Sequence, residues 1–95
     1  MTNDDTQADG DKTGDGKAGI EQLDARHLLC PLPVIRTQNR VATLATGSVL
    51  EVLATDPGVL QDIPAWCRVH GHRFLGAERD GREIRCRLEV RHGRA

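Results

Sequence analysis

From residue 20 onward, the apolar positions of the chain follow the periods of strands and helices. A short, weakly alternating stretch at 20–25 predicts a first strand. Apolar residues then recur with helical spacing from Pro31 to about Ala45, and Gly47 suits the end of that helix. The segment SVLEVLAT at 48–55, rich in Val and Leu, predicts a strand buried on much of both faces. Strand, helix and strand in this order predict a parallel crossover.

A second helix is predicted after this strand. Asp56 suits an N-cap and Pro57 suits the first helical position. Apolar residues continue at helical spacing as far as Gly71, which can end the helix. Pro64 lies inside this segment, so we expect either a kink or a restart of the helix with Asp62 as its cap.

The C-terminal part predicts a β-hairpin. Its two segments, HRFLGAER and REIRCRLEVR, flank Asp80 and Gly81, a pair favoured in two-residue turns. The last strand directs four apolar side chains to one face: Ile84, Cys86, Leu88 and Val90. The whole pattern therefore predicts an α+β fold, a two-layer α/β sandwich of order βαβαββ. Both helices would pack on one face of a four-stranded mixed sheet.

The first nineteen residues have no such pattern, and we predict a disordered acidic tail over 1–19 and one folded domain over 20–95. The tail holds five Asp against two Lys, a charge of −3 within the chain's formal −1, so the domain is close to +2. The domain's positive charge comes from eleven Arg interspersed with nine carboxylates. This composition gives no strong basic patch, so RNA contact is allowed but not implied.

Charge and hydropathy also predict the compartment. The acidic, glycine-rich beginning lacks the basic start and apolar run of a secretory signal, and no segment reaches the apolar length of a membrane span. We therefore predict a cytoplasmic protein without membrane contact. In a reducing compartment the three unevenly spaced cysteines are expected to be thiols.

The stretch LLCPLPVIR is the strongest candidate for chemistry. A residue before proline is pushed out of helical geometry, which predicts Cys30 as an N-cap and Pro31 as the first helical residue. Neither Pro31 nor Pro33 has an N–H, so the amide of Leu32 is the main donor left to face the sulfur. A helix N-terminus lowers a thiol's pKa, which predicts an exposed, reactive cysteine held by a rigid turn. The alternative is a buried cysteine acting as a small hydrophobic residue.

At these residues the chain resembles a known family. LDARHLLCPLP is similar to the signature of the TusA/SirA-like sulfur-carrier family, and GSVLEVLATDPG and DIPAWCRVHGH resemble its second strand and second helix. The resemblance covers residues 20 to 91. It implies a sulfurtransferase or sulfur carrier in which Cys30 accepts sulfane sulfur as a persulfide and passes it to a partner protein.

The resemblance also implies the kind of partner and the absence of a cofactor. Family members need no metal or organic cofactor. Their partners include cysteine desulfurases, rhodanese-like proteins and relays for tRNA thiolation or sulfur oxidation, with cofactor synthesis as a further pathway. The residues before the motif depart from the family at His27, where the usual residue is glycine. That difference predicts an altered loop.

Several polar residues near the motif are weaker candidates. A protonated His27 could stabilise the thiolate, although we favour an exposed loop histidine because closeness in sequence does not ensure contact. Arg36 and Arg40 share the polar face of the first helix, where they serve either solvation or docking of an acidic partner. Asp24 resembles the family's aspartate before the motif and is expected to order the loop rather than act as a base.

The remaining hypotheses are a metal site, a disulfide and a different function. A zinc site would need Cys67, His70, His72 and Cys86, but these lie on different predicted elements without paired Cys-x-x-Cys spacing, so we expect no metal. Cys67 and Cys86 are expected to be structural, and a Cys30–Cys67 disulfide would need a geometry that the sequence does not supply. The alternative function is a non-catalytic regulatory module that binds RNA or protein through its arginine-bearing sheet face.

Overall fold

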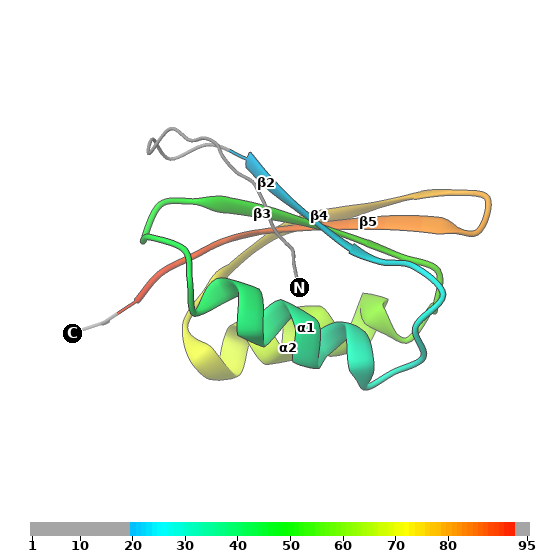
Figure 1. Cartoon of the computed structure of the whole chain (residues 1–95), viewed down its shortest axis with the longest axis horizontal. Helices are drawn as coiled ribbons and strands as arrows, with labels where there is room; N and C mark the ends of the chain where they lie inside the picture. Colours follow the sequence, from blue (N-terminus) through cyan, green and yellow to red (C-terminus); the bar gives the residue numbers. More distant parts are fainter. Residues whose placement is uncertain (1–19, 93–95) are drawn as a thin grey trace, which may run out of the picture.

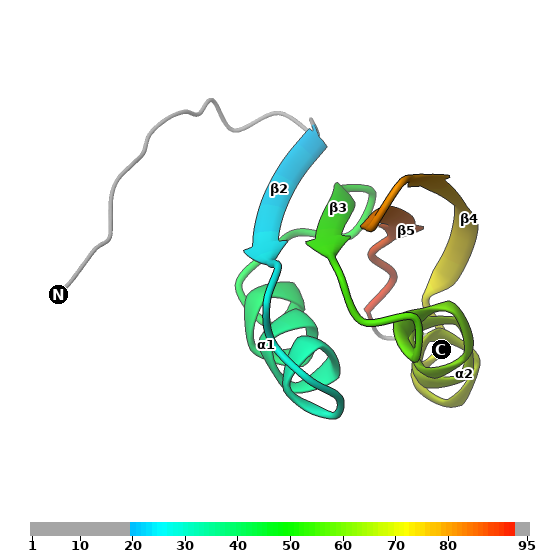
Figure 2. The same cartoon turned by 90° about the vertical axis from the view of Figure 1, so that its right-hand side faces the viewer.

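The computed structural model describes residues 20–92; the tail predicted over 1–19 and the last residues, 93–95, lie outside the described residues. Figures 1 and 2 show two layers, with both helices on one face of the sheet, as the apolar pattern predicts. The elements in chain order are β2 (Ile20–Ala25), α1 (Leu32–Val41), β3 (Val49–Ala54), α2 (Val59–His70), β4 (Arg73–Asp80) and β5 (Glu83–Glu89).

The four strands form one mixed sheet in the order β2-β3-β5-β4. β2 and β3 are parallel, with Leu23 opposite Val52, so α1 is the crossover between them. β3 and β5 are antiparallel, with Val52 opposite Cys86, and β5 pairs with β4 as a hairpin. The two strands that precede helices therefore lie side by side and end at the same edge of the sheet.

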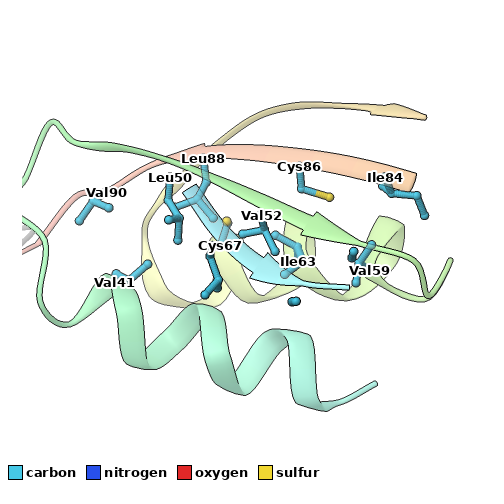
Figure 3. Close-up of a cluster of buried hydrophobic side chains, with 13 residues drawn as sticks. Val41, Leu50, Val52, Val59, Ile63, Cys67, Ile84, Cys86, Leu88 and Val90 are labelled. Atoms are coloured by element: carbon cyan, nitrogen blue, oxygen red, sulfur yellow. The ribbon is translucent and has the colours of Figure 1, made fainter. Parts of the chain in front are cut away.

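The core lies between the sheet and the two helices (Figure 3). Each helix buries one stripe spaced four residues apart: Pro33, Thr37 and Val41 on α1, and Val59, Ile63 and Cys67 on α2. β5 alternates buried and partly exposed residues, so its apolar side chains face the helices as predicted. The fold class predicted from the sequence is confirmed.

The helix boundaries correct the predicted ones. α1 begins at Leu32 with Pro31 as its N-cap, so Cys30 is not the predicted cap but lies one residue before it, and α1 ends at Val41 rather than Ala45. After Val41 the backbone closes a tight turn in which the N–H of Leu44 donates to the carbonyl of Val41 at 3.0 Å, which stops the helix.

α2 also differs from its prediction. Its N-cap is Gly58 instead of Asp56, and the helix runs through Pro64 to His70 without a restart at Asp62. Pro64 lacks the N–H that would donate a hydrogen bond to the carbonyl of Leu60. The side chain of Leu60 is exposed, so the loss of this hydrogen bond is tolerated. None of the described helices has the length and apolar character needed to cross a membrane.

The turn of the hairpin is shifted by one residue. Asp80 still pairs with Glu83 as the last strand position, so Gly81 and Arg82 form the turn rather than Asp80 and Gly81. Gly81 has a φ of 63°, a conformation that glycine adopts without steric cost.

Leu88 and Leu75 provide a matched test of where the core lies. Leu88 is fully buried, whereas Leu75 keeps 46% of its surface exposed. Leu88→Ala is expected to lower the free energy of unfolding by about 2–5 kcal/mol, because it leaves a cavity between sheet and helices. Leu75→Ala should change it by less than about 0.5 kcal/mol. Chemical denaturation measures both, and similar losses in the two variants would contradict this core.

Candidate functional site

Two loops meet at the edge where the parallel strands end. The loop after β2 carries Cys30, and the turn after β3 carries Asp56 and Gly58. A Cβ atom built on Gly58 would lie 3.0 Å from the Sγ of Cys30. The sulfur therefore rests against the N-terminus of α2, although the sequence attaches it to α1. Glycine at position 58 leaves the space that the sulfur occupies.

The Asp56 carboxylate joins the two loops. Its Oδ2 accepts a hydrogen bond from the N–H of Cys30 at 2.8 Å, and its Oδ1 accepts one from the N–H of Gly58 at 3.0 Å. The bond from Cys30, followed by that from Gly58, lowers the pKa of Asp56 below its ordinary value. Asp56 is therefore ionised at neutral pH and fixes the backbone on either side of the sulfur.

The backbone donors near the sulfur are already used. The predicted donor, the amide of Leu32, instead bonds to the carbonyl of Leu29 at 2.9 Å. The N–H of Val59 donates to the carbonyl of Asp56 at 3.1 Å. Pro31 and Pro33 have no N–H to offer. The helix N-termini thus surround the sulfur without giving it a free amide, which corrects the expectation for Leu32.

Asp62 lies one helical turn beyond Gly58, with its N–H bonded to the Gly58 carbonyl at 2.9 Å. Residues four apart share a helix face, and helical side chains lean toward the N-terminus, so the Asp62 carboxylate reaches over Gly58 toward the sulfur. Burial raises the pKa of the Cys30 thiol, and hydrogen bonds to Asp62 and Asp56 together with their negative charges add to this effect; the pKa is about 12 as a result. The predicted lowering of the thiol pKa is wrong.

This arrangement determines the resting state of the site. Cys30 is partly buried, and at neutral pH it is a protonated thiol rather than a thiolate. The thiolate is the nucleophilic form, so Cys30 reacts slowly as long as its thiol is protonated. The chemistry available is that of a thiol whose reactivity depends on the two neighbouring carboxylates.

Sequence reasoning placed Asp56 and Asp62 only as helix caps and missed their contacts with the sulfur. The usable signal was the four-residue spacing between Gly58 and Asp62, which puts a gap and a carboxylate on one face at the start of a helix. It becomes informative only once α2 is known to face Cys30.

His27 has a backbone conformation that glycine adopts most easily. Its φ is 70°, the left-handed region that glycine adopts most easily, and its N–H donates to the Thr55 Oγ1 at 2.8 Å. Its side chain is exposed, and among residues 20–92 no hydrogen bond or ion pair joins it to Cys30. The structure supports the exposed loop histidine.

Of the other charged candidates, two are held by neighbouring residues, whereas the third is exposed and has no ion pair among the described residues. Asp24 accepts hydrogen bonds from the backbone and side chain of Arg26, and the Arg26 side chain lowers the pKa of Asp24 to about 2, so Asp24 orders the loop. Arg40 turns to β2, where it donates to the Gln22 carbonyl at 3.2 Å. Arg36 is exposed on α1 and has no ion pair among the described residues.

The remaining cysteines and histidines lie away from Cys30. Cys67 and Cys86 are free and buried in the core, where burial raises the pKa of each thiol to about 11. His72 stacks on Trp66, with ring centroids 4.9 Å apart, and its Nδ1 accepts the N–H of Arg91. Within residues 20–92 no three His, Cys, Asp or Glu side chains gather as metal ligands would.

Gly58→Ala tests the contact between the sulfur and α2. Gly58 has helical angles, φ −57° and ψ −24°, so alanine fits the backbone and the added methyl meets only the sulfur closely. In a Cys30→Ala background the substitution should stabilise the fold by about 0.4–1 kcal/mol through the unfolded state. With Cys30 present it should destabilise it, and denaturation of the four proteins measures the coupling. An equal effect in both backgrounds would contradict the contact.

The pH dependence of alkylation tests the acidity of Cys30. With its pKa raised from 9.0 to about 12, the rate with iodoacetamide should keep rising beyond pH 10, whereas the denaturant-unfolded chain should level off near its ordinary pKa. The folded state holds this proton more tightly than the unfolded chain, so the free energy of unfolding should fall as pH rises above 9. Peptide mapping separates Cys30 from the buried cysteines, and a plateau below pH 9 would refute the assignment.

Comparison with known proteins places the fold and the motif in one family. The sequence model described as "Sulfurtransferase TusA" matches residues 21–90. The sulfur carrier protein TusA of Pseudomonas entomophila is 47% identical over 58 residues, which are 61% of this chain and 72% of that protein. The putative sulfur carrier protein YrkF of Bacillus subtilis is 44% identical over 63 residues, 66% of this chain but only 34% of YrkF.

A solved structure agrees with these relatives. The crystal structure of a SirA-like protein from Desulfitobacterium hafniense superposes with a TM-score of 0.62 at 28% identity, covering 75% of this chain and 96% of that one. The matched region includes both strand-to-helix loops that form the Cys30 site. The chain therefore belongs to the TusA/SirA-like family.

Proposed function

We propose that this protein is a sulfur carrier that accepts sulfane sulfur on Cys30 as a persulfide and relays it to a partner protein. The observation that carries the proposal is the placement of the three thiols. Cys67 and Cys86 are at most 1% exposed, whereas Cys30 reaches the surface in the loop before α1. Membership of a family whose relatives are named sulfur carriers supports the same role.

The transfer is a thiol–persulfide exchange. The Cys30 sulfur, after losing its proton, attacks the outer sulfur of a donor persulfide; the donor's S–S bond breaks and its electron pair stays on the donor thiolate. Cys30 then carries –S–SH, and the proton returns to the donor thiol. In the second step an acceptor thiolate attacks the outer sulfur and Cys30 leaves as a thiolate. No net oxidation occurs, so no metal or organic cofactor is required.

The neighbouring residues hold this sulfur in place. Pro31 and Pro33 stiffen the start of α1, and Asp56 ties the Cys30 backbone to α2. Arg36, exposed one turn beyond the motif, is the candidate contact for an acidic group of the partner. The donor is a protein of the cysteine desulfurase or rhodanese-like type, and the acceptor serves tRNA thiolation, sulfur oxidation or cofactor synthesis in the cytoplasm. Transfer of this kind makes the protein a sulfurtransferase acting as a relay.

The arginine-bearing sheet face gives the alternative binding module little support. Arg87 is paired with Glu51 at 3.0 Å and with Glu78 at 3.8 Å, so its charge is matched within the sheet. Arg85 and Arg91 on the same face have no ion pair among the described residues, but they are interspersed with Glu83 and Glu89 and form no basic cluster. We therefore do not propose RNA binding by this face.

Intact-protein mass spectrometry without reductant tests the proposal. Incubation with a cysteine desulfurase and cysteine, or with a rhodanese and thiosulfate, is expected to add one sulfur, about 32 Da, that reductant removes. Cys30→Ser should remain unmodified. Cys67→Ser, at a buried thiol, is the matched control and should load like the wild type. No gain of mass with either donor, or a gain that survives in Cys30→Ser, would overturn the proposal.

A further inference from the structure

Three large apolar side chains are exposed beside Cys30. Leu29 is 73% exposed, Leu32 is 45% exposed and Ile35 is 46% exposed. They follow one another along the outside of the loop and the first turn of α1, where the N–H of Leu32 bonds to the carbonyl of Leu29. We call these three residues the apolar ridge. Contiguous exposed apolar surface next to a reactive group is typical of a protein interaction site.

Within the described part of the chain, the carboxylates at the sulfur have no cationic partner. Among residues 20–92, Asp24 pairs with Arg26 and Glu51 pairs with Arg87, but no Lys, Arg or His pairs with Asp56 or Asp62. Both acids are partly exposed, so a group from outside can reach them. The surface beside the ridge is therefore negative at the sulfur, and the unpaired Arg36 adds a positive charge next to Ile35.

We propose that the apolar ridge is the docking surface for the protein that exchanges sulfur with Cys30, and that this partner brings a Lys or Arg side chain to Asp62 and Asp56. The inference rests on the proposed function and names the chemistry of its partner. The ridge supplies apolar area, the carboxylates receive the cation, and Arg36 receives an acidic group. Charges of both signs around an apolar centre fix one orientation of the partner.

The cation has a chemical consequence for the sulfur. Both transfer steps need Cys30 as a thiolate, first as the nucleophile and then as the leaving group. Two carboxylates beside the sulfur oppose that form, and a positive charge placed between them removes the opposition. Docking thus couples arrival of the partner to activation of the thiol. In the free protein the same carboxylates keep the thiol protonated and protect it from oxidants and unrelated disulfides.

Two kinds of donor separate docking from intrinsic reactivity. A cysteine desulfurase with cysteine is the protein donor, and glutathione persulfide is the small-molecule donor. Leu32→Ser should reduce loading from the desulfurase about tenfold, as loss of an interface anchor does, and leave loading from glutathione persulfide unchanged. Leu75→Ser is the matched control, since Leu75 has the same residue type and 46% exposure on β4. It should leave both rates unchanged.

Asp62→Asn tests the cation. Removing this charge should speed the reaction of Cys30 with iodoacetamide and with glutathione persulfide several-fold at pH 7.5, yet slow loading from the desulfurase. Glu89→Gln is the control, because Glu89 pairs with Val49 at the opposite end of β3 from the Cys30 site, and it should affect none of these rates. Circular dichroism and denaturation confirm that each variant is folded before its rates are compared.

The outcomes are distinct. Opposite effects of Asp62→Asn on the two donors, with a selective loss in Leu32→Ser, support the inference. Faster loading from both donors in Asp62→Asn overturns the docking role of this residue, and equal losses in Leu32→Ser and Leu75→Ser overturn the ridge. A wild-type protein that takes sulfur from neither donor overturns the proposed function itself. In that case the alkylation rates of wild type and Asp62→Asn still report whether Asp62 acts on the thiol.

Discussion

The carboxylate of Asp56 is the contact on which the site depends. It bonds to the amides of Cys30 and Gly58 at once, and Cys30 lies 26 residues away in the chain. Each bond to an ionised acceptor is stronger than a neutral one, and together they fix the distance between the two helix starts. A second hydrogen bond between the two loops, from the N–H of His27 to the Thr55 Oγ1 at 2.8 Å, supports this bridge. Parallel pairing of β2 and β3 makes the bridge possible because it brings both loops to one edge.

The acidity of the sulfur follows from a competition of charges. Two helix N-termini lie near Cys30, and each offers roughly half a positive charge. Asp56 and Asp62 each offer a full negative charge at close range, and partial burial removes water that would solvate a thiolate. Because the nearby amides already bond to other acceptors, the helix ends act only through their diffuse field. Burial, together with the two carboxylates, therefore prevails over the helix ends, and the thiol keeps its proton.

Most of the fold could be predicted from local patterns, because the periods of β5 and α2 reflect which side chains face the core. The order of elements and the one-sided packing of helices follow from these periods. The starts of the helices were harder to predict. Asp56 and Pro57 have the composition of a helix cap, yet the Asp56 carboxylate accepts hydrogen bonds from two amides in different loops. A cap rule considers one loop at a time and cannot anticipate that arrangement.

In the candidate site, too, local sequence features could be predicted and contacts between distant segments could not. The choice of Cys30 as the candidate residue could be made from the sequence, because the residues around it in sequence form the motif. Its acidity could not, because Asp62 lies 32 positions farther along the chain and reaches the sulfur only through the packing of α2. The left-handed backbone of His27 is a milder example. The sequence indicated an unusual position, and in the structure the φ of His27 is in the region that glycine favours.

The burial of Cys67 and Cys86 has a consequence for where the proposed carrier could hold sulfur. Both thiols are enclosed by core side chains, so under the proposed function a sulfur atom on Cys30 would find no second accessible thiol among the described residues. In the proposed role, sulfur would therefore load at Cys30 and remain at the surface where it arrived. A chain with three accessible thiols would instead scramble its cargo and close internal disulfides. Under the proposed function, the amount of sulfur available for delivery would then depend on the number of protein chains.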